Sequence, residues 1–313
     1  MNNQRIEQFD SLRGIAAFIV IFHHCLISFP IFLDAYYHEK TTNFFINFLS
    51  STVFHVFWSG HESVILFFVL SGFVLSLPFL NGNHQPYKQY IIKRFTRIYL
   101  PYLTSILFSV ILYTLIKPIS IIGLSEWFNG MWSNPISFKL IISHLLMIGS
   151  ETHNWNTVTW SLVHEMRISI IFPIIIMLVL NFNWRKVIIF SVLITFLFAI
   201  TFFNISRVIP IGSLGFLFRN FGETIHYSLF FIFGAMLAKY RLTLLKVYNK
   251  DKNSLFKIII LVLALILYTI EWTFDGIGYL KYSGSDFQQF FMTMVLNVSI
   301  SIGTSILFVF VFA

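Results

Sequence analysis

The run from Gly14 to Leu33 reads GIAAFIVIFHHCLISFPIFL and decides the fold class. The hydrocarbon core of a bilayer is about 30 Å thick, so a helix needs roughly 20 apolar residues to cross it. This run has that length and contains no Asp, Glu, Lys or Arg. It is longer than the apolar core of a signal peptide, contains His23 and His24, and lacks a cleavage site of small residues. We therefore interpret it as a retained first membrane span.

Similar apolar runs recur along the whole chain. They occupy 64–80, 98–116, 160–180, 187–203, 225–238, 258–272 and 289–313. The composition agrees, because hydrophobic residues make up 57% of the chain and charged residues only 11%, whereas a soluble domain carries about 25% charged residues. We expect an all-α, polytopic integral membrane bundle with at least eight transmembrane helices, forming a single domain over residues 1–313.

The Lys and Arg residues predict the orientation. One further run, Lys139 to Gly149, is too short to cross comfortably. If it does not cross, 14 of the 21 Lys and Arg residues lie on the side of the N-terminus, and only nine do if it crosses. Because basic residues collect on the cytoplasmic side, we expect a short re-entrant or interfacial helix at 139–149. The N-terminus is then cytoplasmic, in the plasma (inner) membrane. The net charge of +8 then requires no nucleic-acid partner, and the expected partner is the lipid bilayer.

The first span carries ionisable residues at a regular spacing. Arg13 and His24 are eleven residues apart, which places them on one helix face about 16 Å apart along the axis. With Arg13 at the inner boundary, His24 is predicted near the middle of the membrane, whereas His23 lies about 80° off that face. Asp10 can pair with Arg13. The alternative is an interfacial anchor at Arg13 and a packing histidine at His24.

Two later segments also carry polar residues. Ser71-Gly72 in the second span permits close approach of helices. Arg94 and Arg97 share a face at a cytoplasmic helix end, where they serve either as orientation signals or as phosphate ligands.

The stretch Trp160 to Arg167, WSLVHEMR, places His164, Glu165 and Arg167 within four residues of an apolar span. Such groups are costly in a membrane and mark either a functional site or an internally compensated patch that packs helices together. The single cysteine, Cys25, excludes an internal disulfide and a cysteine-based metal cluster.

Taken together, these motifs resemble those of the membrane-bound acyltransferase 3 family, in family order and over nearly the whole chain. The matching motifs are Asp10-x-x-Arg13, Arg13-x10-His24, Phe67-Phe68-x-x-Ser71-Gly72-Phe73, Arg94-x-x-Arg97 followed by Tyr99-x-Pro101, Trp160-Ser161-Leu162-x-x-Glu165, and Phe231-x-Phe233-Gly234-Ala235-Met236-Leu237. Members of that family move acyl groups from acyl-CoA to hydroxyls, often of extracytoplasmic sugars.

The resemblance implies a set of site residues. It makes His24 and Arg13 essential, places Arg94 and Arg97 on the acyl-CoA side, and has Glu165 line the same core cavity. We group Ser71 with the donor-binding residues.

The expected function is transfer of an acyl group, specifically acetyl, from acyl-CoA (acetyl-CoA) to a hydroxyl of an extracytoplasmic or cell-surface carbohydrate or glycolipid. No metal is needed, because neutral His24 can take the hydroxyl proton as the oxygen attacks the thioester. An acyl-histidine intermediate is an alternative to direct transfer. Arg13, with Asp10, would hold the acyl-CoA approach or the cavity geometry, and Glu165 would orient the acceptor or raise the basicity of a histidine.

Two other functions are open: a transporter or flippase that uses His24, Glu165 and Arg167 as a proton or substrate pathway, and an inactive, family-shaped partner protein. The chain also departs from the family pattern in two places. Ile168-Ser169 stand where the family has an aromatic pair ending in Tyr, and the chain stops at Ala313 within an apolar stretch. We expect from the second departure that the C-terminal helices of the family are missing.

Overall fold

A computed structural model describes the chain in seven segments. They are 7–82, 85–117, 119–148, 155–209, 213–250, 253–274 and 284–312. Within these segments every regular element is a helix. The chain divides into two compact units, residues Met1–Leu80 with Phe230–Ala313, and residues Asn81–Leu229. The predicted all-α polytopic architecture is confirmed.

Among the described residues, seven helices are long and apolar enough to cross a membrane. They are α1 (Glu7–Ile27), α4 (Gly60–Leu80), α5 (Tyr87–Ile116), α9 (Thr159–Asn181), α10 (Trp184–Val208), α11 (Ser213–Lys250) and α15 (Asp286–Phe312). Each coincides with a run that the sequence predicts as a span. The remaining run, 258–272, falls on α12 (Ser254–Tyr268), which has 15 residues, and on the short α13 (Ile270–Thr273).

The first span ends earlier than predicted. Helix α1 stops at Ile27, and a second helix, α2 (Pro30–Tyr36), follows directly. Proline lacks the N–H that a continuing helix needs, but it is favoured in the first turn of a new one. The predicted boundary at Leu33 was therefore wrong, because hydropathy does not register the break that Pro30 introduces.

The first unit is built around α4. Helices α1 and α15 pack on α4, and α12 packs along α15. A Cβ on Gly72 of α4 would collide with the backbone of Phe231 on α11, and a Cβ on Gly234 would collide with the backbone of Val69. These two glycines therefore allow α4 and α11 to approach at the level of their backbones.

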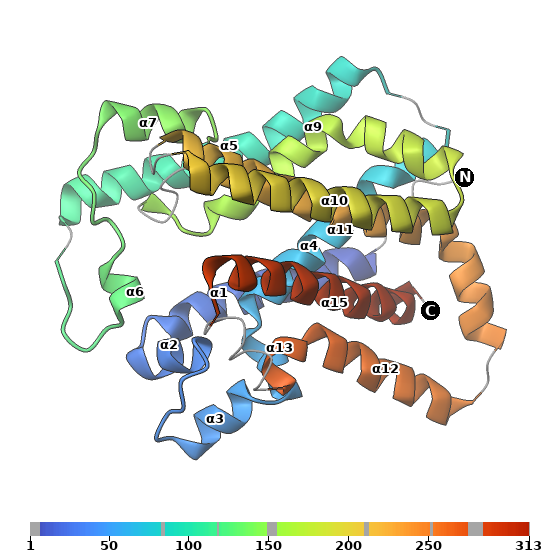
Figure 1. The fold of residues 1–313 in the computed structure, drawn as a ribbon, viewed down its shortest axis with the longest axis horizontal. Coiled ribbons are helices and arrows are strands. Elements are labelled where there is room, and N and C mark those ends of the chain that lie inside the picture. Colours follow the sequence, from blue (N-terminus) through green and yellow to red (C-terminus); the bar gives the residue numbers. More distant parts are fainter. Residues whose placement is uncertain are drawn as a thin grey trace. The chain divides into compact units, whose positions relative to one another are not determined.

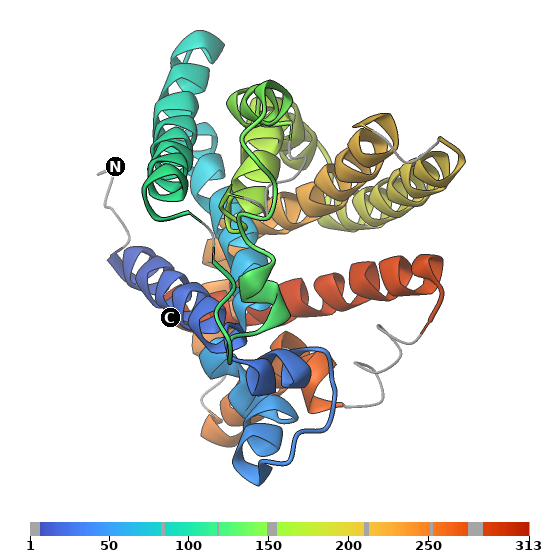
Figure 2. The same cartoon turned by 90° about the vertical axis from the view of Figure 1, so that its left-hand side faces the viewer.

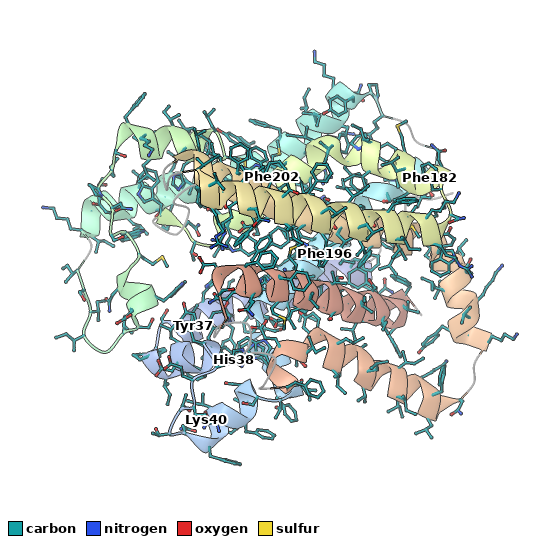
Figure 3. The ribbon with its side chains drawn as sticks, in the orientation of Figure 1. Tyr37, His38, Lys40, Phe182, Phe196 and Phe202 are labelled. Atoms are coloured by element: carbon teal, nitrogen blue, oxygen red, sulfur yellow. The ribbon has the colours of Figure 1, made fainter. Side chains whose placement is uncertain are left out.

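Short helices cover one end of this unit. They are α2, α3 (Phe44–Ser50), the 3₁₀ helix η1 (Val53–Trp58) and α13. In Figures 1 and 2 the blue α2 and α3 lie beside the orange α13, and Figure 3 labels His38 just past α2. Because η1 contacts α1, α12 and α13, this end of the unit gathers segments that are more than 200 residues apart in the chain.

The second unit contains α5, α6 (Glu126–Asn129), α7 (Phe138–Leu145), α9, α10 and α11 up to Leu229. Helix α7 is the short helix predicted at 139–149, and its eight residues extend only about 12 Å. The hydroxyls of Tyr99 and Tyr102 on α5 donate to the carbonyls of Leu145 and His144, both at 2.9 Å. The end of α7 is thus fixed against α5.

Candidate active site

Two histidines lie side by side at the end of α1. His24 is in the last turn of the helix, and its predicted depth near the middle of the membrane stays a prediction. Its side chain is partly exposed, and its ring meets that of His23 edge to face, with centroids 5.3 Å apart. Earlier in the helix, Nη1 of Arg13 lies 3.4 Å from Oδ1 of Asp10, which confirms the predicted pair.

His23 is held in one orientation. Its Nδ1 donates to the carbonyl oxygen of Trp58 at 2.9 Å, and the side chain is only 5% exposed. Because a carbonyl oxygen can only accept, the proton of a neutral His23 resides on Nδ1 and leaves Nε2 as the acceptor. A Cβ on Gly60 would come within 2.5 Å of the ring. His23 therefore locks the end of α1 against η1 and the first residue of α4.

Five aromatic rings, the first of them His23, form an unbroken series. The ring of His23 stacks on Trp58 at 5.9 Å, Trp58 meets His55 at 4.5 Å, and His55 stacks on Trp272 at 3.8 Å. Trp272 stacks in turn on His38 at 4.5 Å. We call His23, His38, His55, Trp58 and Trp272 the histidine–tryptophan cluster. Three of its five members are histidines, and the first of them, His23, contacts His24.

Two carboxyl groups are bonded to this cluster. The Nε1 of Trp272 donates to Oε1 of Glu62 at 2.6 Å, and Nε2 of His38 lies 3.5 Å from Oε1 of Glu271. Both glutamates are at most 3% exposed. Removing such groups from water is costly unless they are hydrogen-bonded, so the cluster is a buried polar site within the first unit.

His55 differs from its neighbours in the cluster. It lies between α3 and α4, its side chain is 0% exposed, and neither ring nitrogen has a hydrogen-bond partner among the described residues. Burial lowers the pKa of His55 well below its usual value of 6.5, and the nearby His23 and His38 act in the same direction. The imidazole is therefore neutral at neutral pH.

The sequence did not single out this cluster. Its members come from four separate segments, and only the spacing His55-x-x-Trp58-x-x-His61-Glu62 just before the second span gave a local signal. Among the residues that the structure describes, no three His, Cys, Asp or Glu side chains are grouped so as to hold a metal ion.

Ser71 lies on α4 beside Gly72, and its side chain is partly exposed. The predicted close approach of helices at Ser71-Gly72 is confirmed by Gly72. The assignment of Ser71 to donor binding stays a prediction.

In the second unit, hydrogen bonds fix the register of α5 against α9. The hydroxyl of Tyr87 donates to the carbonyl of Ile170 at 3.1 Å, and that of Tyr90 donates to the carbonyl of Ser169 at 2.8 Å. As the residue number rises along α5 it falls along α9, so the two helices are antiparallel here.

This register places two predicted site residues near Tyr90. Arg94 follows Tyr90 by one turn on α5, and Glu165 precedes Ser169 by one turn on α9, so each lies about one turn from the Tyr90–Ser169 hydrogen bond. Electrostatic interactions of Tyr90 with both Arg94 and Glu165 agree with this placement. Arg97 is almost one turn further along α5 and is exposed.

Arg167 is held by side chains and carbonyls. Its Nη1 donates to Oδ1 of Asn220 and to Oγ1 of Thr224, the latter at 3.1 Å. Its Nη2 donates to the carbonyls of Met147 at 3.3 Å and Ile148 at 2.7 Å. The guanidinium thereby connects α9 and α11 to the residues that follow α7. The transporter hypothesis places Arg167 in a proton or substrate pathway, whereas these contacts hold its guanidinium within a network of the protein.

His164 extends the same network. The hydroxyl of Thr224 donates to the carbonyl of Asn220 at 2.9 Å, so its oxygen accepts from Nδ1 of His164 at 2.8 Å. Nε2 of His164 lies 3.8 Å from Oε2 of Glu223, whose other oxygen is 3.6 Å from Nε of Arg219. We call Arg167, His164, Asn220 and Thr224 the Arg167 network. His164 and Arg167 thus form an internally compensated patch, which is one of the two alternatives that the sequence left open.

The predicted site residues thus belong to both units: Arg13, His24 and Ser71 to the first, and Arg94, Arg97 and Glu165 to the second. In a comparison with protein families, a family model described as an acyltransferase domain matches residues 6–313. No curated protein and no solved structure matches the chain. The family match covers nearly the whole chain and includes all six of these residues.

Proposed function

The chain belongs to the acyltransferase 3 family, and from this membership we propose its acyl donor and its acceptor. It is a membrane acyltransferase with several spanning helices. We propose that acyl-CoA, specifically acetyl-CoA, is the donor and that a hydroxyl of an extracytoplasmic or cell-surface carbohydrate is the acceptor. The proposed location is the plasma (inner) membrane, with the N-terminus in the cytoplasm.

In the proposed reaction, His24 is the general base. The acceptor oxygen attacks the carbonyl carbon of the thioester while His24 takes the hydroxyl proton. The C–O bond forms, the C–S bond breaks, and the proton passes to the departing CoA sulfur. No metal is required for this step, because a neutral imidazole is a sufficient base near neutral pH.

The observation that carries this proposal is the position of His24. It is partly exposed at the end of α1, and its ring rests on that of the buried His23. A catalytic base needs a neighbour that fixes its orientation and a side open to substrate. His23, fixed by the Trp58 carbonyl, meets the first need, and the partial exposure of His24 meets the second.

The remaining site residues have proposed binding roles. Arg94 and Arg97 would bind CoA phosphates, because guanidinium groups match phosphate geometry. Glu165, which shares the surroundings of Tyr90 with Arg94, would orient the acceptor or raise the basicity of a histidine. Arg13 with Asp10 would hold the approach of acyl-CoA, and Ser71 would belong to the donor-binding set.

The test measures acyl transfer by purified protein that carries a substitution at one of the two adjacent histidines. Labelled acetyl-CoA is the donor. The acceptor is identified by mass spectrometry of surface glycans from cells with and without the gene. His24→Ala should lower kcat by about 10²-fold or more, the usual contribution of a general base. His23→Asn should lower kcat much less, because the Asn side-chain amide still donates a hydrogen bond to the Trp58 carbonyl from the position of Nδ1. Equal losses of kcat in the two variants, at equal protein levels, would refute the assignment of His24 as the base. Detection of an acylated His24 by mass spectrometry would instead show a two-step mechanism in place of direct transfer.

A further inference from the structure

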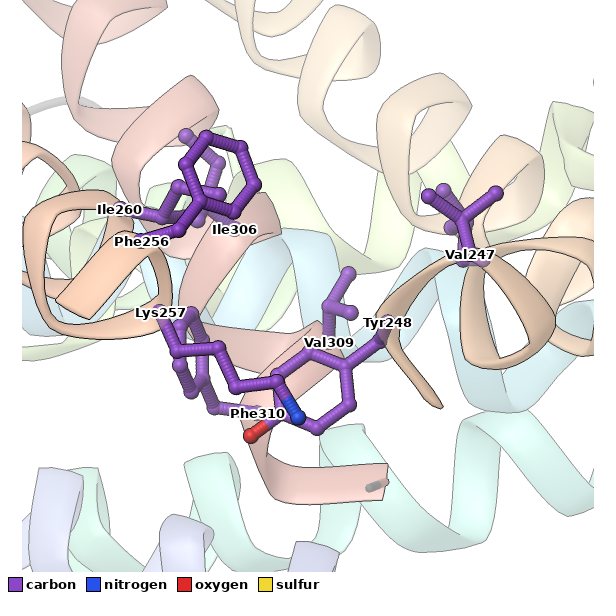
Figure 4. A pocket seen from close by; sticks show the side chains of 9 residues that line it. Val247, Tyr248, Phe256, Lys257, Ile260, Ile306, Val309 and Phe310 are labelled. Atoms are coloured by element: carbon purple, nitrogen blue, oxygen red, sulfur yellow. The ribbon is translucent and has the colours of Figure 1, made fainter. Parts of the chain in front are cut away.

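A groove of about 200 Å³ lies in the first unit, between the last turns of α11, the first turns of α12 and the last turns of α15. Its walls are aliphatic and aromatic, and they include Val247 and Tyr248 on α11 and Ile306 and Phe310 on α15. Figure 4 shows these side chains surrounding the hollow. The groove is large enough for a stretch of hydrocarbon chain and offers almost nothing to a polar ligand.

Among the described residues that line the groove, Lys257 is the only charged one. Its Nζ lies 3.9 Å from the centroid of the Tyr248 ring, and Figure 4 shows the two side chains next to each other beside Phe310. Between residues 224 and 270 the sequence contains six Lys and Arg residues but a single acidic residue. Lys257 thus places one positive charge at an otherwise apolar groove, within a segment of the chain that is rich in basic residues.

We propose that this groove binds one acyl chain of an anionic phospholipid, whose headgroup phosphate is held by Lys257. Charge complementarity selects this occupant, because basic pockets between membrane helices bind anionic lipid headgroups. A free phosphate would gain nothing from the apolar walls. A zwitterionic phospholipid has the same acyl chain, but its headgroup also carries an ammonium group that Lys257 would repel.

The groove is remote from the histidine–tryptophan cluster. Lys257 is in the first turn of α12 and Tyr268 is at its end, a separation of about 16 Å along the helix. Trp272 of the cluster follows that end. A lipid in the groove therefore stabilises the first unit without contact with His24, and this inference stands whether or not His24 is the catalytic base.

The experiment measures thermal unfolding of the whole chain in detergent with three additives: phosphatidylglycerol, phosphatidylcholine with the same acyl chains, and glycerol phosphate. Saturating phosphatidylglycerol should raise Tm by about 5 °C, phosphatidylcholine much less, and glycerol phosphate not at all. Equal effects of the two lipids would overturn the role of the headgroup, and an effect of glycerol phosphate alone would show a phosphate site without a chain.

Substitutions in and beside the groove test whether the lipid binds there. Lys257→Gln should weaken phosphatidylglycerol binding about fivefold, the contribution expected of one lysine near an anionic lipid. Lys246→Gln is the matched control, because Lys246 is an exposed lysine of the same basic segment that does not line the groove. Val247→Trp, at a side chain that is 66% exposed, should cover the groove and weaken both lipids. Equal effects of Lys257→Gln and Lys246→Gln would overturn the proposal, as would displacement of the lipid by acyl-CoA.

Discussion

His55 in the first unit and His164 in the second are equally buried, but their ring nitrogens have opposite surroundings. His55 is stacked against Trp272 and has no hydrogen-bond partner among the described residues. His164 donates to Thr224, and its second nitrogen faces Glu223. The contacts of each histidine are typical of its surroundings. Ring contacts hold most of the histidine–tryptophan cluster together, whereas hydrogen bonds hold the Arg167 network together.

The difference indicates what each region does. A buried polar network whose members are bonded stabilises one arrangement of helices, and breaking it is costly. A buried imidazole without a partner contributes little to stability and is unusual enough to require another explanation. We infer that the Arg167 network is structural, whereas the cluster beside His24 supports the chemistry.

The largest effect on stability is expected at Arg167. Arg167→Met removes the hydrogen bonds to Asn220, Thr224 and two carbonyls, and it should lower the free energy of unfolding by about 3 kcal/mol. The matched control is Arg219→Gln, because Arg219 is 53% exposed and makes one ion pair, so its loss should cost at most about 0.5 kcal/mol. Thermal unfolding in detergent measures both. Similar values for the two variants would contradict the structural role of Arg167.

A second pair of variants compares the two histidines directly. His164→Phe loses the bond to Thr224 and should destabilise the protein by about 1 kcal/mol. His55→Phe keeps the ring between Trp58 and Trp272 and removes two unbonded nitrogens, so stability should stay within about 0.5 kcal/mol of wild type. If the cluster supports catalysis, His55→Phe lowers acyl transfer at unchanged stability. A large loss of stability in His55→Phe would show instead that its nitrogens are bonded in the folded protein.

The spanning helices could be predicted from the sequence because the bilayer imposes a length on them. Seven of the eight long apolar runs fall on helices long enough to span, and the short run 139–149 falls on the short helix α7. That this helix does not cross the membrane stays a prediction. The Asp10–Arg13 pair was also predictable, since it depends only on the three-residue spacing within one helix. The end of α1 was not, because Pro30 introduces a break within a run that stays apolar.

The cluster and the partners of Arg167 could not be predicted because they join distant segments. Trp272 and His55 are 217 residues apart in the chain, and nothing local to either one indicates that their rings stack. The sequence left open whether Arg167 marks a functional site or an internally compensated patch, and its partners Asn220 and Thr224 come from another helix. Their four-residue spacing just before the apolar run 225–238 was the available signal.

A smaller effect, on binding, is expected at the start of α5, and it rests on the proposed role of Arg94. Tyr90→Phe removes the hydrogen bond to Ser169 next to Arg94 and Glu165, and it should raise KM for acyl-CoA about fivefold with little change in kcat. Tyr87→Phe removes the same kind of bond, to Ile170, and serves as the control. An equal rise in KM for both variants would mean that these tyrosines only hold α5 against α9.

The last prediction concerns the pH dependence of stability and the contribution that His55 alone makes to it. Unfolded His55 gains a proton as the pH falls through 6.5, whereas folded His55, with its lowered pKa, stays neutral between Trp58 and Trp272. The folded state then binds fewer protons, so acid destabilises it. By pH 5.5 this contribution amounts to about 1 kcal/mol, and above pH 7 it vanishes.

His55→Phe deletes this contribution, while the other titrating groups around it, His23 of α1, His38 after α2, Glu62 of α4 and Glu271 of α13, stay in place. The fall in Tm between pH 7.5 and pH 5.5 should therefore be smaller in the variant than in wild type by about 2 °C or more. Both proteins are unfolded thermally in the same detergent, so pH effects common to the two cancel in the difference. An equal fall in Tm for the two proteins would mean that His55 takes up a proton in the folded state, and that the cluster accepts a charge within its stack of rings.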